Sequence, residues 1–375
     1  MAPPRHRDVR EGSFQGRILF SLPEDMLQDV QSVRIFERLF LSLLCKPILL
    51  NEGTTRITTV ISDALTEIDV LVYRQYHKFW SNFSTDFHES PSESTKFDGR
   101  EPVKARLFVK LRPKYLIQHS SAVHVAAAKR LTKLLPIELS SQSSLEINLM
   151  LSNEVLFLGL PLNRSIKQTV HPHYGLRHTT AAAIIRNLKS GVILDPMCGA
   201  GVLLCEAAIR MDSRTARLEH CAFLSRSSLF LVGIDCCEDQ LDRARKNLLH
   251  TETQLVRSHS YWDLVCCSAE NLPFRPGVFD AVVCDLPFGQ KHGAVDRNLV
   301  SFEREKLEKL YEHVLSSIPR ILQPEGQYAL LVGSSLAQFT RTLLHNLHCS
   351  IDMDESISLG LTEARLLSGV LESGD

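Results

Sequence analysis

Residues 191–201 read GVILDPMCGAG, an apolar run that ends in an acid, Asp195, followed by two glycines, Gly199 and Gly201. This order predicts a buried strand, a tight turn and a helix beginning at Val202. Glycine suits such a turn because a residue without a Cβ takes a positive φ and lets the backbone approach a ligand. Ligands of open α/β sheets bind at the carboxyl ends of the strands. The stretch therefore predicts a parallel α/β sheet with a ligand site at this turn.

The spacing of the glycines indicates the class of ligand. A dinucleotide-binding turn reads G-x-G-x-x-G, but Leu204 occupies the third glycine position. The acid ahead of the glycines suits a ligand with an amino group better than one with a pyrophosphate. Both features disfavour a dehydrogenase. The pattern D-x-x-x-G-x-G instead resembles the first motif of S-adenosylmethionine-dependent methyltransferases.

Other strand ends and a helix start fit the same ligand. A second apolar strand ends at Asp235, where a carboxylate would accept both ribose hydroxyls, and Ser268 and Ala269 lie where the adenine would be held. Thr180 lies at the start of a helix expected over Ala181–Leu188, where it is first a cap and secondarily a contact to the ligand's carboxylate. Together these signals are more specific for S-adenosylmethionine than the glycine turn alone.

The strand over Phe279–Cys284 ends in DLPFG, residues 285–289, which indicates the substrate. It resembles the [DNS]-P-P-[YF] signature of methyltransferases that alkylate planar exocyclic amines, with Leu286 in place of the first proline. Asp285 and a neighbouring carbonyl would hold the hydrogens of such an amine, Phe288 would stack on the base, and Pro287 would stiffen the turn. The alternative is a proline-containing strand end with an ordinary core Phe. On DLPFG alone, a DNA or protein-glutamine methyltransferase also remains open.

Composition sets wider bounds. The 375 residues suffice for two or three domains, and the net charge of -1 means that any RNA binding must come from local basic patches. The ten cysteines lack C-x-x-C spacing, which suits reduced thiols inside the cell and no metal site. The apolar run Leu39–Leu50 is too short to span a membrane, and the first residues lack a signal core. His171, His173 and His178 are expected in a solvated loop.

The amino-terminal half reads as a different, α+β region. We expect a strand over Gly16–Phe20, a helix over Asp25–Cys45 and a linker over Ser81–Pro102. Val103–Leu111 alternates apolar and polar residues, which predicts a half-buried strand. Its exposed face would contact RNA phosphates and stack on a base through five residues: Lys104, Arg106, Phe108, Lys110 and Arg112. The alternative is an ordinary solvated strand face.

The order of parts resembles the THUMP-domain RNA methyltransferases, which modify guanosine at its 2-amino group in tRNA or small nuclear RNA. The resemblance lies in ERLFL, GLPLNR, GLRHTTAAA, LDPMCGAG and DLPFG. It implies a partial ferredoxin-like region (1–80), a THUMP-like RNA-binding region (81–165) and a Rossmann-like methyltransferase domain (166–375). It further implies S-adenosylmethionine as cofactor, structured RNA as substrate and a cytoplasmic or nuclear location. A small zinc-binding activator subunit is the implied protein partner.

A second hypothesis is a catalytically weak or inactive RNA-binding scaffold of the same family. It is motivated by Ser268, where the family usually has Asp, and by an amino-terminal part that begins at what should be its second strand. Cofactor binding would separate the two hypotheses. Beyond DLPFG, the carboxyl-terminal residues predict further helices and strands, with a last strand over Ile357–Leu367, that complete the sheet with an antiparallel addition. Gln290–Val300 is expected to be a substrate lid.

Overall fold

The computed structural model describes residues 38–48, 50, 56–73, 102–112, 114–143, 145–152, 154–162, 171–173, 175–189, 191–211, 229–255, 260–288, 297–359 and 362–372. The chain divides into two compact units, with the main boundary between residues 165 and 166. The expected strand over Gly16–Phe20 and most of the Ser81–Pro102 linker lie outside the described residues.

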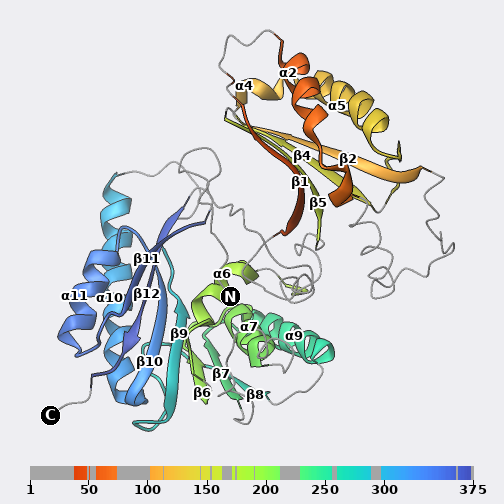
Figure 1. The fold of residues 1–375 in the computed structure, drawn as a ribbon. Helices are drawn as coiled ribbons and strands as arrows, with labels where there is room; N and C mark the ends of the chain where they lie inside the picture. The colour runs from red at the N-terminus through yellow and green to blue at the C-terminus, as the bar shows by residue number, and fades with distance from the viewer. Residues whose placement is uncertain are drawn as a thin grey trace, which may run out of the picture. The chain divides into compact units, whose positions relative to one another are not determined.

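The first unit is a five-stranded sheet with helices on one face (Figure 1). The strand order is β1-β5-β4-β2-β3, with β1 Phe40–Pro47, β2 Val103–Leu111, β3 Ile137–Leu139, β4 Glu146–Leu151 and β5 Val155–Pro161. The helices are α2 Ile57–Ala64, the short α4 Lys114–Ile117 and α5 Ser120–Leu134. Ile57 and Ile61 of α2 and Val123, Ala127 and Leu131 of α5 are buried. This apolar packing holds the helices together over the sheet.

Strand β1 corrects the helix that the sequence predicted over Asp25–Cys45. Residues 40–47 pair antiparallel with β5, from Phe40 opposite Pro161 to Pro47 opposite Val155. A short apolar run does not distinguish the repeat of a helix from that of a strand. Here the run forms a strand because it pairs with β5, more than a hundred residues further along the chain. The same pairing places segments from 1–80 and 81–165 in one sheet, so the described residues show no structural division between those two expected regions.

The second unit is a seven-stranded, largely parallel sheet covered on both faces, which confirms the predicted Rossmann-like class. Its order is β11-β12-β10-β9-β6-β7-β8, with β6 Val192–Asp195, β7 Leu229–Asp235, β8 Ser260–Cys266, β9 Phe279–Asp285, β10 Leu322–Gly333, β11 Met353–Ser358 and β12 Glu363–Val370. One face is covered by α6 His178–Ile185, α7 Val202–Met211 and α9 Glu238–Gln254, and the other by α10 Arg297–Ile321 and α11 Ala337–Asn346 (Figure 1). Alternate strand residues serve the two cores: Ile193 lies in one and Leu194 in the other.

Three details of this unit differ from the sequence expectation. Strand β8 was not predicted, because its residues are only partly buried and carry no apolar run. The expected last strand over Ile357–Leu367 is two antiparallel strands, β11 and β12. Helix α10 begins at Arg297, so the last four residues of the expected lid are helical, while residues 290–296 lie outside the described part.

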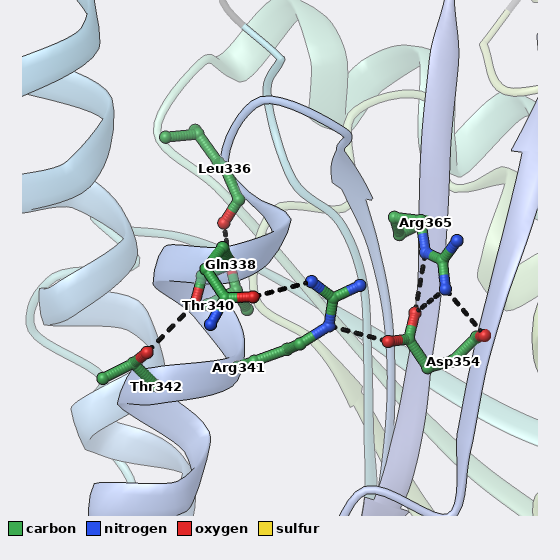
Figure 2. A network of polar contacts seen from close by, with 7 residues as sticks. All are labelled: Leu336, Gln338, Thr340, Arg341, Thr342, Asp354 and Arg365. Atoms are coloured by element: carbon green, nitrogen blue, oxygen red, sulfur yellow. Dashed lines mark hydrogen bonds and ion pairs between the residues drawn. The ribbon is translucent and has the colours of Figure 1, made fainter.

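An ion-pair network ties the carboxyl-terminal strands to α11 (Figure 2). Asp354 of β11 accepts from Arg341 of α11 at 2.7 Å and from Nε of Arg365 of β12 at 2.7 Å. The hydrogen bond from Arg341 is the largest of the effects that lower the pKa of the Asp354 carboxyl. A shared carboxylate between two guanidinium groups therefore fixes the antiparallel addition at the sheet's edge.

Candidate active site

The predicted ligand residues come together at one edge of the second sheet. Strands β9, β6, β7 and β8 are consecutive neighbours and all parallel, so their carboxyl ends share that edge. Asp285, Asp195 and Asp235 are the last residues of β9, β6 and β7. The turn with Ser268 and Ala269 follows β8. The sequence predicted that these strand ends serve one ligand, and the topology brings them together at one edge of the sheet.

The glycine turn has the backbone shape that its sequence predicts. Gly199 has φ +49° and Gly201 has φ +74°. A Cβ on Gly201 would also lie 3.0 Å from the Cβ of Ala244 in α9, whereas a Cβ on Gly199 would meet nothing within 4 Å. Gly201 thus permits close packing against α9. At Gly199 the left-handed conformation alone favours glycine, and the space above it is open to a ligand.

The Asp235 carboxylate is held between β7 and the glycine turn. One oxygen accepts from the Gly199 amide at 3.0 Å and the other from the Cys237 amide at 2.9 Å. Each carboxylate oxygen keeps a second lone pair for a ligand. In this orientation the carboxylate could also accept hydrogen bonds from two vicinal hydroxyl groups of a ligand.

The three aspartates make the site electronegative. Asp195 is 1 % exposed, and burial raises its pKa well above the ordinary value. The Met197 amide, at 3.1 Å, opposes that rise, while the charges of Asp285 and Asp235 add to it. Burial also raises the pKa of Asp285 to about 6. A ligand carrying positive charge would relieve this repulsion, so these three carboxyl groups fit an amino-acid ammonium beside a sulfonium.

The turn after β9 is braced by residues that sequence reasoning missed. The buried Tyr311 hydroxyl of α10 donates to the Pro287 carbonyl at 3.1 Å, and burial raises the pKa of that phenol, so it remains a neutral donor. The Leu286 amide donates to the Leu331 carbonyl at 3.0 Å. Phe288 is half-buried, and a Cβ on Gly333 would lie 3.3 Å from its Cβ. No local sequence pattern connects Tyr311 or Gly333 to this turn, because both contacts depend on the tertiary fold.

The remaining cofactor candidates differ in exposure. Ser268 is exposed, and its Oγ accepts from the Glu270 amide at 3.2 Å, while Ala269 is buried. Thr180 is buried in the first turn of α6. The N-cap of that helix is Arg177 and has no side-chain capping hydrogen bond, so the predicted capping role of Thr180 is wrong.

The expectation of a solvated loop is wrong at His171. The His171 side chain is 7 % exposed, and its Nε2 lies 3.1 Å from Oε1 of Glu206, which is 1 % exposed. Glu206 is a buried carboxylate of α7, and its contact with the imidazole is the physical reason for the burial of His171. No cluster of His, Cys, Asp and Glu suited to a metal ion occurs among the described residues.

Strand β2 of the first unit has the predicted two faces. Ala105, Leu107 and Leu111 are buried, while Lys104, Phe108 and Lys110 are exposed, as is Arg112 just after the strand. Arg106 differs from the expectation of a free cation. Its guanidinium lies 4.6 Å from the centre of the Phe108 ring and 3.1 Å from the Glu146 carboxylate, which also binds Arg38 at 2.8 Å.

The sheet order, the glycine turn and the acids at its strand ends define an S-adenosylmethionine-dependent methyltransferase fold. Residues 167–353 match the family model described as RMKL-like, methyltransferase domain. Over these residues the second unit is similar to that methyltransferase domain. None of the helices among the described residues is long and apolar enough to cross a membrane.

Relatives with curated names are RNA guanine-N2 methyltransferases. The chain is 29 % identical over 204 residues to human tRNA (guanine(6)-N(2))-methyltransferase THUMP3, which covers 51 % of this chain and 35 % of that protein. It is 29 % identical over 199 residues to mouse U6 snRNA (guanine-N(2))-methyltransferase THUMPD2, covering 51 % and 31 %. The similarity thus spans about a third of the length of these relatives.

Solved structures share the fold over most of the chain. TrmN from Thermus thermophilus aligns with a TM-score of 0.59 at 17 % identity, covering 94 % of this chain and 87 % of that one. A possible methylase from Clostridium difficile 630 aligns with a TM-score of 0.62 at 15 % identity, covering 97 % and 93 %. SMU.472, whose structure is a complex with SAH, aligns with a TM-score of 0.55 at 14 % identity, covering 90 % and 85 %.

Proposed function

We propose that the protein is an S-adenosylmethionine-dependent RNA methyltransferase that forms N2-methylguanosine in tRNA or small nuclear RNA. The observation that carries the proposal is the convergence of Asp195, Asp235 and the glycine turn with the DLPFG turn at one sheet edge. The names of the relatives support guanine-N2 as the target. Such an enzyme acts where these RNAs occur, in the nucleus or the cytoplasm.

In this proposal the cofactor supplies an electrophilic methyl group. Asp195, Gly199 and Gly201 hold its amino-acid end with Thr180, Asp235 binds the ribose, and Ser268 and Ala269 border the adenine. The guanine amine is a poor nucleophile because its lone pair is delocalised into the ring. Ionised Asp285 and the Pro287 carbonyl, which Tyr311 orients, accept its two hydrogens and aim the lone pair. Asp285 is then placed to take the proton that the alkylated amine loses.

Nucleoside mass spectrometry tests the reaction directly. RNA from cells lacking the protein should lose N2-methylguanosine at one site, and the purified protein should restore it in the presence of S-adenosylmethionine. An unchanged modification profile, together with no transfer in vitro, would refute the proposal.

The second candidate is a non-catalytic RNA-binding relative. It is favoured by the exposed serine at position 268, where the family's usual Asp would grip the adenine more strongly. Calorimetry with S-adenosylmethionine discriminates, because a scaffold does not need to bind the cofactor.

We propose that the first unit captures the RNA and that the helix-free face of β2 contributes to the contact. Lys104, Lys110 and Arg112 are exposed there beside the exposed ring of Phe108. The double variant Lys104→Gln/Lys110→Gln should bind RNA more weakly, with a loss that is uniform across sequences. The log-log dependence of affinity on salt should flatten by somewhat under one unit for each lost phosphate contact. Thermal stability should change little, because the core-facing residues are untouched.

A substitution at Glu146 is expected to have the opposite effect on RNA binding. It lies between Arg38 and Arg106 and offsets their charge, so Glu146→Gln should strengthen RNA binding and steepen its salt dependence. Filter binding over a salt series measures both variants. Unaltered slopes in both would leave this face as an ordinary solvated surface and direct the search to Lys129, Arg130 and Lys133.

We also propose a small zinc-binding activator subunit as partner, on the strength of the family resemblance. Strand β8 is one of the two edge strands of the described seven-stranded sheet, and it carries Tyr261, 64 % exposed, opposite Phe230 of β7, 41 % exposed. An exposed aromatic pair beside an open sheet edge suits a protein contact. Isolation of the tagged protein from its own cells should recover a small zinc-containing polypeptide. Recovery of the protein alone would contradict this.

A further inference from the structure

The buried amide of Asn247 joins two segments beside the glycine turn. Asn247 is 0 % exposed in α9, and its Nδ2 donates to the Ala200 carbonyl at 2.8 Å and to the His173 carbonyl at 3.1 Å. Its Oδ1 accepts from the His173 amide at 2.9 Å. Ala200 lies between the two glycines of the turn, so one side chain fixes both that turn and the segment leading to α6.

Two further contacts fasten the same segment. The Nε2 atom of His171 lies 3.1 Å from Oε1 of Glu206, which lies in the helix that starts directly after the turn. Gly175 closes the other end, because a Cβ there would lie 2.9 Å from Cγ2 of Val202. Residues 171–173 and 175 are thus held against α7 and α9 by contacts on both sides of the Asn247 bridge.

We infer that Asn247 and the His171–Glu206 pair are positioning residues that hold the glycine turn in its cofactor-binding shape. A turn rich in glycine loses more conformational entropy on ordering than other backbone. The hydrogen bond from Asn247 to the Ala200 carbonyl fixes the backbone between Gly199 and Gly201. The contact between His171 and Glu206 holds in place the backbone of His173, to which the Asn247 amide also bonds. Ordering the turn before the cofactor arrives raises affinity, because binding no longer bears that entropic cost.

This inference rests on the proposed cofactor site, and it predicts that cofactor affinity falls while kcat changes little. Asn247→Leu retains the size of the side chain but removes both donors and the acceptor. Its dissociation constant for S-adenosylhomocysteine, measured by calorimetry, should rise about tenfold. The KM for S-adenosylmethionine should rise in parallel, with kcat at saturating cofactor changed less than about threefold. His171→Ala should shift affinity in the same direction, and His171→Gln, which can still donate to Glu206, should restore most of it.

Thr251 provides the matched control for stability. It is also buried in α9, one turn further on, and its hydroxyl donates to the Asn247 carbonyl at 2.9 Å. Thr251→Val should lower the melting temperature and leave cofactor affinity unchanged. If Asn247→Leu binds S-adenosylhomocysteine as the wild type does, or loses affinity only as much as an equally destabilised Thr251→Val, the inference is overturned.

Two further outcomes, a variant that does not fold and a wild type that does not bind the cofactor, can be told apart. Should Asn247→Leu fail to fold, the His171→Ala and His171→Gln pair decides the question by the same binding measurement, and equal affinity in both overturns the inference. If the wild type itself binds neither cofactor form, the proposed function fails, and the inference fails with it for that separate reason.

Discussion

Asp285→Ala is expected to abolish methyl transfer, with a loss of about a hundredfold to a thousandfold or more, while cofactor affinity stays within a few-fold. The expectation follows from the assignment of Asp285 to the guanine amine and not to the adenosine. Its carboxylate lies at the end of β9, whereas the residues proposed to bind the ribose and the adenine lie at the end of β7 and after β8. Single-turnover transfer and calorimetry, performed on the same preparation, measure the two quantities. Loss of cofactor binding large enough to explain the whole defect would refute the assignment.

The raised pKa of Asp285 gives this prediction a pH signature. Because burial raises that pKa to about 6, and because only the ionised form can take the proton that the alkylated amine loses, transfer should rise with pH through about 6 and then level off. The same shift works against folding. The pKa of Asp285 is higher in the folded protein than in the unfolded chain. Ionisation of this group therefore lowers the free energy of unfolding by up to about 3 kcal/mol above pH 6, and has no such effect below about pH 4. Asp285→Asn should therefore be more stable than wild type at pH 7.5 and equally stable at pH 4.

Local features of the site could be predicted from sequence because their causes are local. The positive φ values of Gly199 and Gly201 follow from an acid, a turn and a helix within eleven residues. The alternating burial of β2 follows from the two-residue period of a strand. In each case the residues that determine the structure are neighbours in the chain.

Features that depend on distant partners could not be predicted. Strand β1 was taken for a helix because its pairing partner, β5, lies over a hundred residues away. His171 was expected in solvent because Glu206, which buries it, is 35 residues further on. Tyr311 gave no signal at all, since its hydroxyl meets Pro287 only once α10 has packed on the sheet. The residues that support the site depend on tertiary contacts, whereas the residues assigned to ligand contact lie within local sequence motifs.

Asp235→Ala is expected to raise the dissociation constant for S-adenosylmethionine by about tenfold to a hundredfold. A carboxylate that accepts both ribose hydroxyls makes two charge-assisted hydrogen bonds, and each tenfold step in affinity corresponds to about 1.4 kcal/mol. The structure adds a second contribution, because Asp235 also accepts the Gly199 amide at 3.0 Å and so helps to shape the glycine turn.

A matched control separates this contact from a general effect of charge. Asp263 lies on the adjacent strand β8, is exposed, and accepts only the amide of its neighbour Leu264 among the hydrogen bonds of the described residues. Asp263→Ala removes the same charge from the same unit and should leave cofactor affinity unchanged. Calorimetry with 2′-deoxy- and 3′-deoxy-analogues of S-adenosylhomocysteine then tests the ribose assignment. Wild type should lose affinity for each analogue, whereas Asp235→Ala should no longer distinguish them from the parent compound. If both variants bind the cofactor as the wild type does, Asp235 is an acid that orders the turn at a strand end, and the ribose contact must lie elsewhere.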